Sequence, residues 1–150
     1  MTTDNVRDYL IYEVIAGSKA YGLDIPTSDT DIRGIFMLPN SWLLGNRKCE
    51  QINNPSNDIV YYELNRFIHL LQENNPNILE ELFVPEDKIL LMSDRLTPLY
   101  NNRMKFLTKK CRNTFGGYSI SQIKKARGLN KKIVNPVDKK RKTPLDFCYI

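Results

Sequence analysis

Two aspartates separated by one residue, Asp29 and Asp31, are the strongest candidates for chemistry in this chain. Alternate side chains of a strand share a face, so a strand through both residues puts the carboxylates about 6–7 Å apart at the backbone. At that separation they can jointly bind one divalent cation and share a second one about 3.5–4 Å away. Magnesium is the expected ion because it prefers hard oxygen ligands and keeps water and substrate phosphates in its shell. Mn²⁺ can substitute for it, since it also suits carboxylate ligands.

A Gly17-Ser18 pair ends the apolar run that precedes the aspartates. Glycine lets a phosphate approach the backbone closely, and successive N–H groups after a strand form an anion-binding nest. The Ser18 hydroxyl adds a hydrogen bond, and Lys19 adds positive charge. Arg33 shares the predicted face of the two aspartates, where it either contacts phosphate or only offsets the carboxylate charges. Nucleotide binding is therefore expected at Gly17, Ser18, Lys19 and Arg33.

A third carboxylate is expected from a later strand, and two residues compete for that role. Asp58 lies in strand phase with Val60 and Tyr62, so it can project toward the metal face from the start of its strand. Glu63 lies at the predicted strand-to-helix junction, where an acid is also favourable for the helix dipole. We prefer Asp58, which makes Asp29, Asp31 and Asp58 the expected catalytic and metal-binding set.

Hydrophobic periodicity predicts the elements that must position these groups. Strands are expected at 9–16, 29–38, 58–62 and 88–92, with a connection at 18–28 and a loop at 39–57. Helices are expected from Glu63 onward, from the Asn75 cap and Pro76 through Phe83, at 95–112 and at 115–130. Strands come first and helices follow, which predicts an α+β fold: a small mixed sheet with flanking helices.

Glu80 and Glu81 are adjacent acids on one of the predicted helices. Neighbouring residues of a helix point in different directions, so these two carboxylates are poor partners for one ion. We expect them to be solvated, or at most to pair with the basic C-terminal region.

The formal net charge of +5 conceals a strong asymmetry along the chain. Residues 1–100 contain eight Lys and Arg against fifteen Asp and Glu, whereas residues 101–150 contain fourteen against two. We expect residues 1–100 to be the catalytic core and 101–150 a basic helical region with a C-terminal arm. RNA or another polyanion is the expected partner of residues 103–142, above all of Lys139, Lys140, Arg141 and Lys142. The alternative is a solvated helix face followed by a mobile tail.

Several protein classes do not fit this composition. No apolar run approaches the roughly 20 residues needed to cross a bilayer, and the N-terminus lacks the features of a secretory signal, so no membrane partner is expected. The three cysteines are far apart and have no zinc-site spacing, which favours reduced thiols in a cytoplasmic protein. The oligomeric state is left open.

These motifs together resemble a known family. The run Gly17-Ser-Lys-Ala-Tyr-Gly-Leu23, followed by Ser28-Asp-Thr-Asp-Ile-Arg-Gly34, resembles the polymerase-beta nucleotidyltransferase superfamily, and within it the RNA-repair-pathway polymerase-beta branch. The resemblance continues through Asp58–Leu64, Asn75-Pro76, Glu80–Phe83 and Gly117-Tyr118 with Gln122, so it covers most of the chain.

The resemblance implies a short mixed sheet, metal held by Asp29 and Asp31, a third carboxylate from a later strand, and a nucleoside triphosphate as donor. The implied reaction moves a nucleoside monophosphate to a hydroxyl of an RNA end, a protein or a small molecule. A further C-terminal part is expected, because the resemblance is to longer proteins and the chain ends in the apolar run Leu145–Ile150. The alternatives from other classes are a catalytically weak nucleic-acid-binding protein and a toxin–antitoxin-type interaction protein of the same fold.

Overall fold

A computed structural model describes residues 5–44 and 48–126. Its strands are β1 (Leu10–Ala16), β2 (Asp31–Phe36), β3 (Gln51–Asn53), β4 (Ile59–Glu63) and β5 (Ile89–Met92). Its α-helices are α1 (Gly17–Ala20), α2 (Asn40–Leu44), α3 (Leu64–Gln72), α4 (Pro76–Glu81), α5 (Thr97–Asn101) and α6 (Cys111–Ala126). Short 3-10 helices are η1 (Arg7–Tyr9), η2 (Glu86–Lys88) and η3 (Arg103–Phe106).

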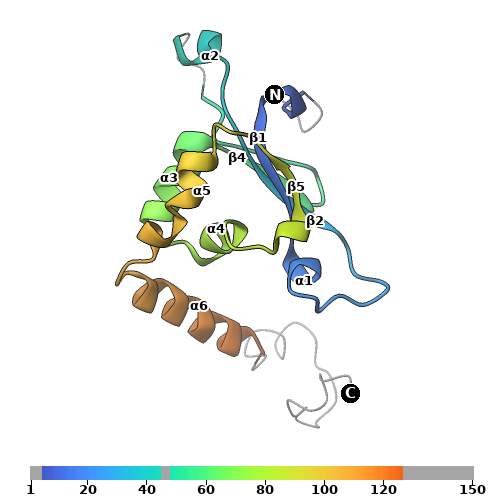
Figure 1. Ribbon diagram of the computed structural model, residues 1–150. Coiled ribbons are helices and arrows are strands. Elements are labelled where there is room, and N and C mark those ends of the chain that lie inside the picture. The colour runs from blue at the N-terminus through green and yellow to red at the C-terminus, as the bar shows by residue number, and fades with distance from the viewer. Residues whose placement is uncertain (1–4, 45–47, 127–150) are drawn as a thin grey trace. The chain divides into compact units, whose positions relative to one another are not determined.

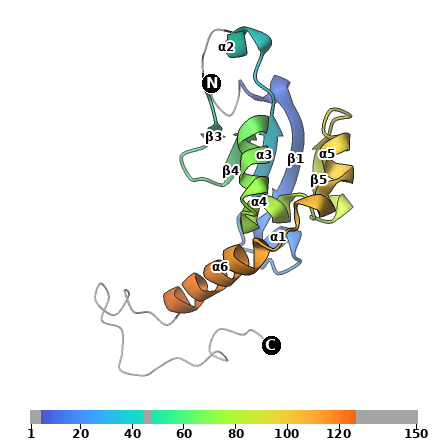
Figure 2. The same cartoon turned by 90° about the vertical axis from the view of Figure 1, so that its left-hand side faces the viewer.

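The five strands form one mixed sheet in the order β3-β4-β2-β1-β5. β1 pairs antiparallel with both β2 and β5, β3 pairs antiparallel with β4, and β2 and β4 run parallel. The predicted α+β fold with a small mixed sheet and flanking helices is confirmed. Helices α3, α4 and α5 lie on one side of the sheet (Figures 1 and 2).

The main core lies between that face of the sheet and the three helices. Tyr12 and Val14 of β1 and Ile35 of β2 pack there against buried side chains of α3 and α4. The expected apolar stripe of α3 is confirmed, because Phe67 and Leu71 are fully buried in this core. A smaller cluster comprises Val6, Phe36, Ile52 and Tyr61.

Two helix starts follow the expected capping chemistry. The Glu63 carboxylate accepts hydrogen bonds from the backbone N–H groups of Asn65 and Arg66 at the start of α3. The Asn75 side chain likewise accepts from the backbone of Asn77 and Ile78, and Pro76 occupies the first turn of α4. Local sequence is therefore sufficient to set where both helices begin.

Three predictions of elements were wrong. The connection after β1 begins with the short helix α1, and the loop expected at 39–57 contains α2 and β3. The single helix expected at 95–112 is divided into α5 and η3. The Asn102 side chain donates to the Pro98 carbonyl at 2.8 Å, so it competes with the helical backbone where α5 ends.

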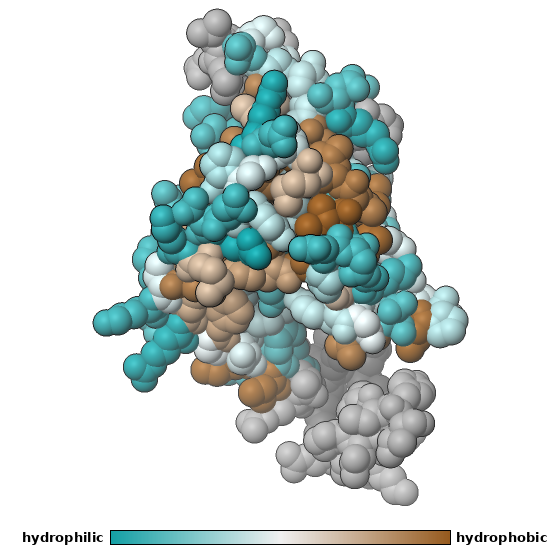
Figure 3. Space-filling view, viewed as in Figure 1, coloured by the Kyte–Doolittle hydropathy of each residue, from teal (hydrophilic) through white to brown (hydrophobic). Residues whose placement is uncertain are grey.

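The residues up to Phe115 form one compact unit, and α6 from Gly116 onward is grouped separately. No helix of the described part of the chain is long and apolar enough to cross a membrane. Figure 3 shows apolar side chains interspersed with polar ones on the face that it presents.

Candidate functional site

The end of β1 and the start of β2 bring the Gly-Ser turn next to Asp31. Ala16 is the antiparallel partner of Asp31, so Gly17 follows directly beside that aspartate. Gly17 has φ +64°, and a β-carbon at this position would lie 3.1 Å from Cγ of Asp31 and still closer to Oδ2. Only glycine therefore combines this backbone conformation with the space that the Asp31 carboxylate occupies.

The turn after Gly17 is closed by backbone hydrogen bonds. The Ser18 carbonyl accepts from the N–H groups of Tyr21 and Leu23 at 3.2 and 3.0 Å. The Lys19 ammonium donates to the Thr30 hydroxyl, which ties α1 to the residue before β2. Ser18 and Lys19 thus lie on the same short segment as Gly17, close to the start of β2.

Asp31 is paired with Arg33 on the same strand. Nη2 of Arg33 donates to Oδ1 of Asp31 at 2.9 Å, and the two side chains are 23% and 28% exposed. Nη1 of Arg33 donates to the carbonyl oxygens of Ile32 at 3.0 Å and Asp58 at 2.9 Å. This ion pair offsets the charge of the Asp31 carboxylate, and a contact of Arg33 with phosphate stays a prediction.

Asp58 lies beside the Asp31–Arg33 pair. Its carbonyl accepts from the Ile32 N–H at 2.7 Å, immediately before the parallel pairing of Ile32 with Ile59. Its carboxylate accepts a hydrogen bond from the Ser56 hydroxyl. The backbone of Asp58 is thus at the same end of the sheet as Asp31.

Glu63 lies at the other end of the same strand. It pairs in register with Phe36, the last residue of β2, whereas Asp31 is the first. Its carboxylate is buried and is engaged in capping α3. The parallel register therefore separates the two candidates for the third carboxylate along the length of β4.

Asp29 precedes β2, which begins at Asp31, two residues later than expected. It is exposed, and the strand alternation that was expected to align it with Asp31 does not reach it. Among the described residues, no three His, Cys, Asp or Glu side chains are gathered so that they could hold one metal ion.

The donors nevertheless suit one kind of ion. Magnesium is commonly bound by one or two carboxylates together with substrate phosphates. Asp31 is partly exposed, and the missing side chain of Gly17 leaves room for its carboxylate. Asp31, with Asp29 close by in sequence, therefore fits a hard divalent cation that takes its remaining ligands from a substrate.

A buried carboxyl, Glu81 of α4, was missed by sequence reasoning. The expectation that Glu81 is solvated is wrong, because it is only 4% exposed, whereas Glu80 is exposed. Burial raises the pKa of Glu81 well above its ordinary value, and the Arg33 charge acts in the opposite direction. The sequence did contain a signal for this burial. Glu81 follows Ile78 by three residues, and residues three apart share a helix face, so Glu81 lies on the face that buries Ile78.

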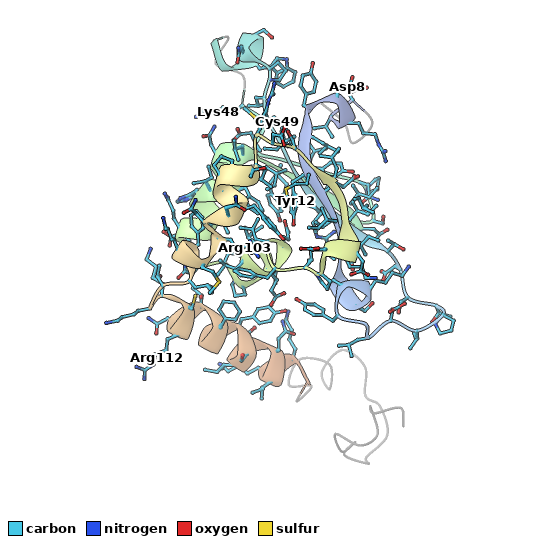
Figure 4. All side chains as sticks on the ribbon, in the orientation of Figure 1. Asp8, Tyr12, Lys48, Cys49, Arg103 and Arg112 are labelled. Atoms are coloured by element: carbon cyan, nitrogen blue, oxygen red, sulfur yellow. The ribbon has the colours of Figure 1, made fainter. Side chains whose placement is uncertain are left out.

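The basic region is described only in part. Lys139, Lys140, Arg141 and Lys142 lie outside the described residues. Arg103 is half-buried, with its guanidinium 4.1 Å from the Tyr100 ring centroid and 5.5 Å from that of Phe83. This arginine packs inside the fold, where Figure 4 shows it near Tyr12 between sheet and helices.

Comparisons with known proteins show the family to which the chain belongs. The model of a family described as the RNA repair pathway DNA polymerase beta family matches residues 2–140. The uncharacterized protein YcgL of Bacillus subtilis (strain 168) is 30% identical over 77 residues, which are 49% of this chain and 30% of that protein. The matched segment thus spans less than a third of that relative. No solved structure matches the chain.

Proposed function

Because the chain belongs to the RNA repair pathway DNA polymerase beta family, we propose that it is a metal-dependent nucleotidyltransferase. The reaction transfers a nucleoside monophosphate from a nucleoside triphosphate to a hydroxyl and releases pyrophosphate. Family membership supports a nucleotidyltransferase-like role. The particular reaction, the metal ion and the substrates are what we propose.

The contact between Asp31 and Gly17 carries this proposal. A partly exposed carboxylate lies beside a strand-to-helix turn that has no side chain at its first residue. Phosphate oxygens can approach such a turn closely, and a carboxylate next to it is suitably placed for a cation bound to the same phosphates.

Each residue of the site has a defined task in this reaction. Asp31 and Asp29 would hold the divalent cation, which when bound would supply charge neutralisation and lower the pKa of the attacking hydroxyl. Gly17 and Ser18 bind phosphate oxygens of the donor, and Lys19 and Arg33 offset their charge. The protein thereby fixes donor and acceptor in line, which is most of what such a transfer requires of it.

Asp58 is proposed to orient the attacking hydroxyl or accept its proton. Its position at the Asp31 end of the sheet supports this role, because a group acting on the acceptor must reach the same phosphate. The Ser56 hydroxyl, which bonds its carboxylate, would then hold the side chain until the acceptor arrives.

An RNA end is the proposed acceptor, guided by the basic residues between 103 and 142. Lys105, Lys109 and Arg112 are exposed, so this part of the region is accessible to a polyanion. A protein hydroxyl and a small molecule are the other acceptor classes.

The test is incubation with each labelled nucleoside triphosphate and Mg²⁺ against RNA, protein and small-molecule acceptors. We expect the unmodified protein to transfer label and release pyrophosphate, and we expect Asp31→Asn to lose both activities. RNA binding without any nucleotide transfer would indicate a nucleic-acid-binding protein instead. A chain that neither transfers nucleotide nor binds RNA would indicate an interaction protein of the toxin–antitoxin type.

A further inference from the structure

Glu81 is a buried carboxyl whose hydrogen-bonding capacity is not fully used. Among the described residues, Oε2 of Glu81 and Nε of Arg103 are the buried side-chain atoms without a hydrogen-bond partner. Ile78, Leu79 and Leu82, which surround Glu81 in sequence, all belong to the main core. An apolar side chain would thus suit this position better for stability alone, because a buried polar atom without a partner is costly.

Three strands present groups to Glu81. The Tyr12 hydroxyl of β1 donates to the Glu81 backbone carbonyl at 2.8 Å, which leaves the carboxyl itself unbonded by Tyr12. The pKa of Tyr62 on β4 is raised mainly by burial and in second place by the Glu81 charge, whereas the Arg33 charge lowers it. Arg33 of β2 is the cation that acts on Glu81, yet it forms no ion pair with it within 4.0 Å, and its ion pair is with Asp31.

Arg33 shares its face of β2 with Ile35, which packs in the main core together with the apolar neighbours of Glu81 in sequence. Arg33 thus lies on the side of the sheet that α4 covers, and it faces two carboxyls, one partly exposed and one buried. Its present partner, Asp31, is the residue to which the proposed function assigns a divalent cation. Arg33 and a divalent cation on the same carboxylate would repel each other strongly, since like charges a few ångströms apart in a partly buried site are weakly screened. Arg33 must therefore move away from Asp31, and a displaced guanidinium that stays buried needs another anion.

We propose that Glu81 is a positioning residue that receives Arg33 when a divalent cation binds Asp31, so that Arg33 alternates between the two carboxyls. This inference rests on the proposed metal binding at Asp31. It accounts for a carboxyl buried in an apolar core without a full set of partners, because the partner arrives only with the metal. The move would leave the Asp31 carboxylate free of its ion pair with Arg33 and available to the cation.

The test measures the melting temperature and the Mn²⁺ affinity of variants at Glu81. A purely structural role of Glu81 would not change these two quantities in opposite directions. Glu81→Gln is expected to raise the melting temperature of the metal-free protein, because it removes a buried carboxyl. The same variant is expected to weaken Mn²⁺ binding, measured by calorimetry with a non-hydrolysable nucleoside triphosphate present, by about fivefold or more, the usual size of coupling between sites. Glu81→Met is the second variant and is expected to shift both quantities in the same two directions.

Glu80→Gln is the matched control on the same helix. Glu80 is exposed and accepts a hydrogen bond from the Tyr21 hydroxyl at 2.6 Å, so this variant changes an acid of α4 without touching the buried position. Mn²⁺ affinity should stay within twofold of the unmodified protein. Equal weakening by Glu80→Gln and Glu81→Gln would overturn the proposal, because general charge loss would then explain both.

A double-mutant cycle with Arg33→Gln tests whether Glu81 acts through Arg33. In the Arg33→Gln protein, Glu81→Gln should leave Mn²⁺ affinity unchanged, since no guanidinium has to be received. The same weakening with and without Arg33 would overturn the inference. Metal binding that is lost in Asp31→Asn but unaffected by Glu81→Gln overturns the inference alone, whereas absence of metal binding in the unmodified protein overturns the proposed function as well.

Discussion

The carboxyl carbon of Asp31 lies 3.1 Å from the point where a β-carbon would project from Gly17. The first residue after β1 thus has to be glycine for two independent reasons, its φ of +64° and the space taken by the aspartate. Gly22 shares only the first reason, because its φ is +65° and a β-carbon there would meet nothing within 4 Å.

Gly17→Ala is therefore expected to impair the site, with Gly22→Ala as its control. Both variants should lose about 1 kcal/mol of unfolding free energy from the left-handed backbone conformation. Gly17→Ala should in addition displace the Asp31 carboxylate and reduce nucleotidyl transfer by at least tenfold. Denaturant titration measures the loss of stability, and transfer assays measure the loss of activity. Equal transfer rates in both variants would show that Gly17 has no special role in the site.

Asp31→Asn should remove most of the rise in melting temperature that Mg²⁺ or Mn²⁺ causes in the presence of nucleotide. In the metal-free protein the variant also breaks the ion pair with Arg33. That loss should be small, about 0–1 kcal/mol, because the pair is partly exposed and screened by solvent. Thermal unfolding with and without metal measures both, and an unchanged metal response would place the ion elsewhere.

Asp58→Asn and Glu63→Gln are expected to fail in different ways. Asp58→Asn should reduce transfer on the order of 10²-fold or more but leave nucleotide binding largely intact, because the proposed metal ligands Asp29 and Asp31 are unchanged. Glu63→Gln should mainly cost stability, about 0.5–1 kcal/mol, since it weakens the cap of α3. Single-turnover kinetics and unfolding titrations distinguish them, and an inactive but fully stable Glu63→Gln protein would reverse the assignment.

The pH dependence of stability should report Glu81. Burial raises its pKa in the folded protein above the ordinary value of 4.5, so the folded state binds more protons than the unfolded state above that pH. The resulting stabilisation is complete below pH 4.5 and is lost as pH rises through the raised pKa. Glu81→Gln lacks this loss, so its stability advantage over the unmodified protein should grow with pH across that interval in denaturant titrations. An advantage independent of pH would show that Glu81 does not titrate there.

Simultaneous replacement of Lys139, Lys140, Arg141 and Lys142 by Ala should weaken RNA binding for all sequences alike. It should also flatten the dependence of affinity on salt, because fewer phosphates are neutralised. Lys88→Ala is a suitable control, since this lysine lies outside residues 103–142 and pairs with Asp87 at 2.7 Å. Binding that is undetectable in the unmodified protein at low salt would shift the acceptor toward proteins or small molecules.

Local patterns were enough for much of the scaffold. The apolar run of β1, the stripe of α3 and the Asn75-Pro76 start of α4 depend on neighbours within a few residues, so the amino-acid order predicts them. The three-residue strand β3 was missed because only its pairing with β4 defines it. The prediction of one helix at 95–112 was wrong because α5 ends at Asn101. There the Asn102 side chain donates to the Pro98 carbonyl, which a backbone N–H would bond if the helix continued.

The site divides in the same way. The sequence places Gly17-Ser18 and the two aspartates at either end of a short connection, and spacing alone makes them candidates. The partner of Arg33, the separation of Asp58 from Glu63 along β4 and the burial of Glu81 all depend on strand register and on helices packing across the sheet. Those contacts join residues far apart in the chain, and hydrophobic periodicity carries no information on which charged groups they bring together.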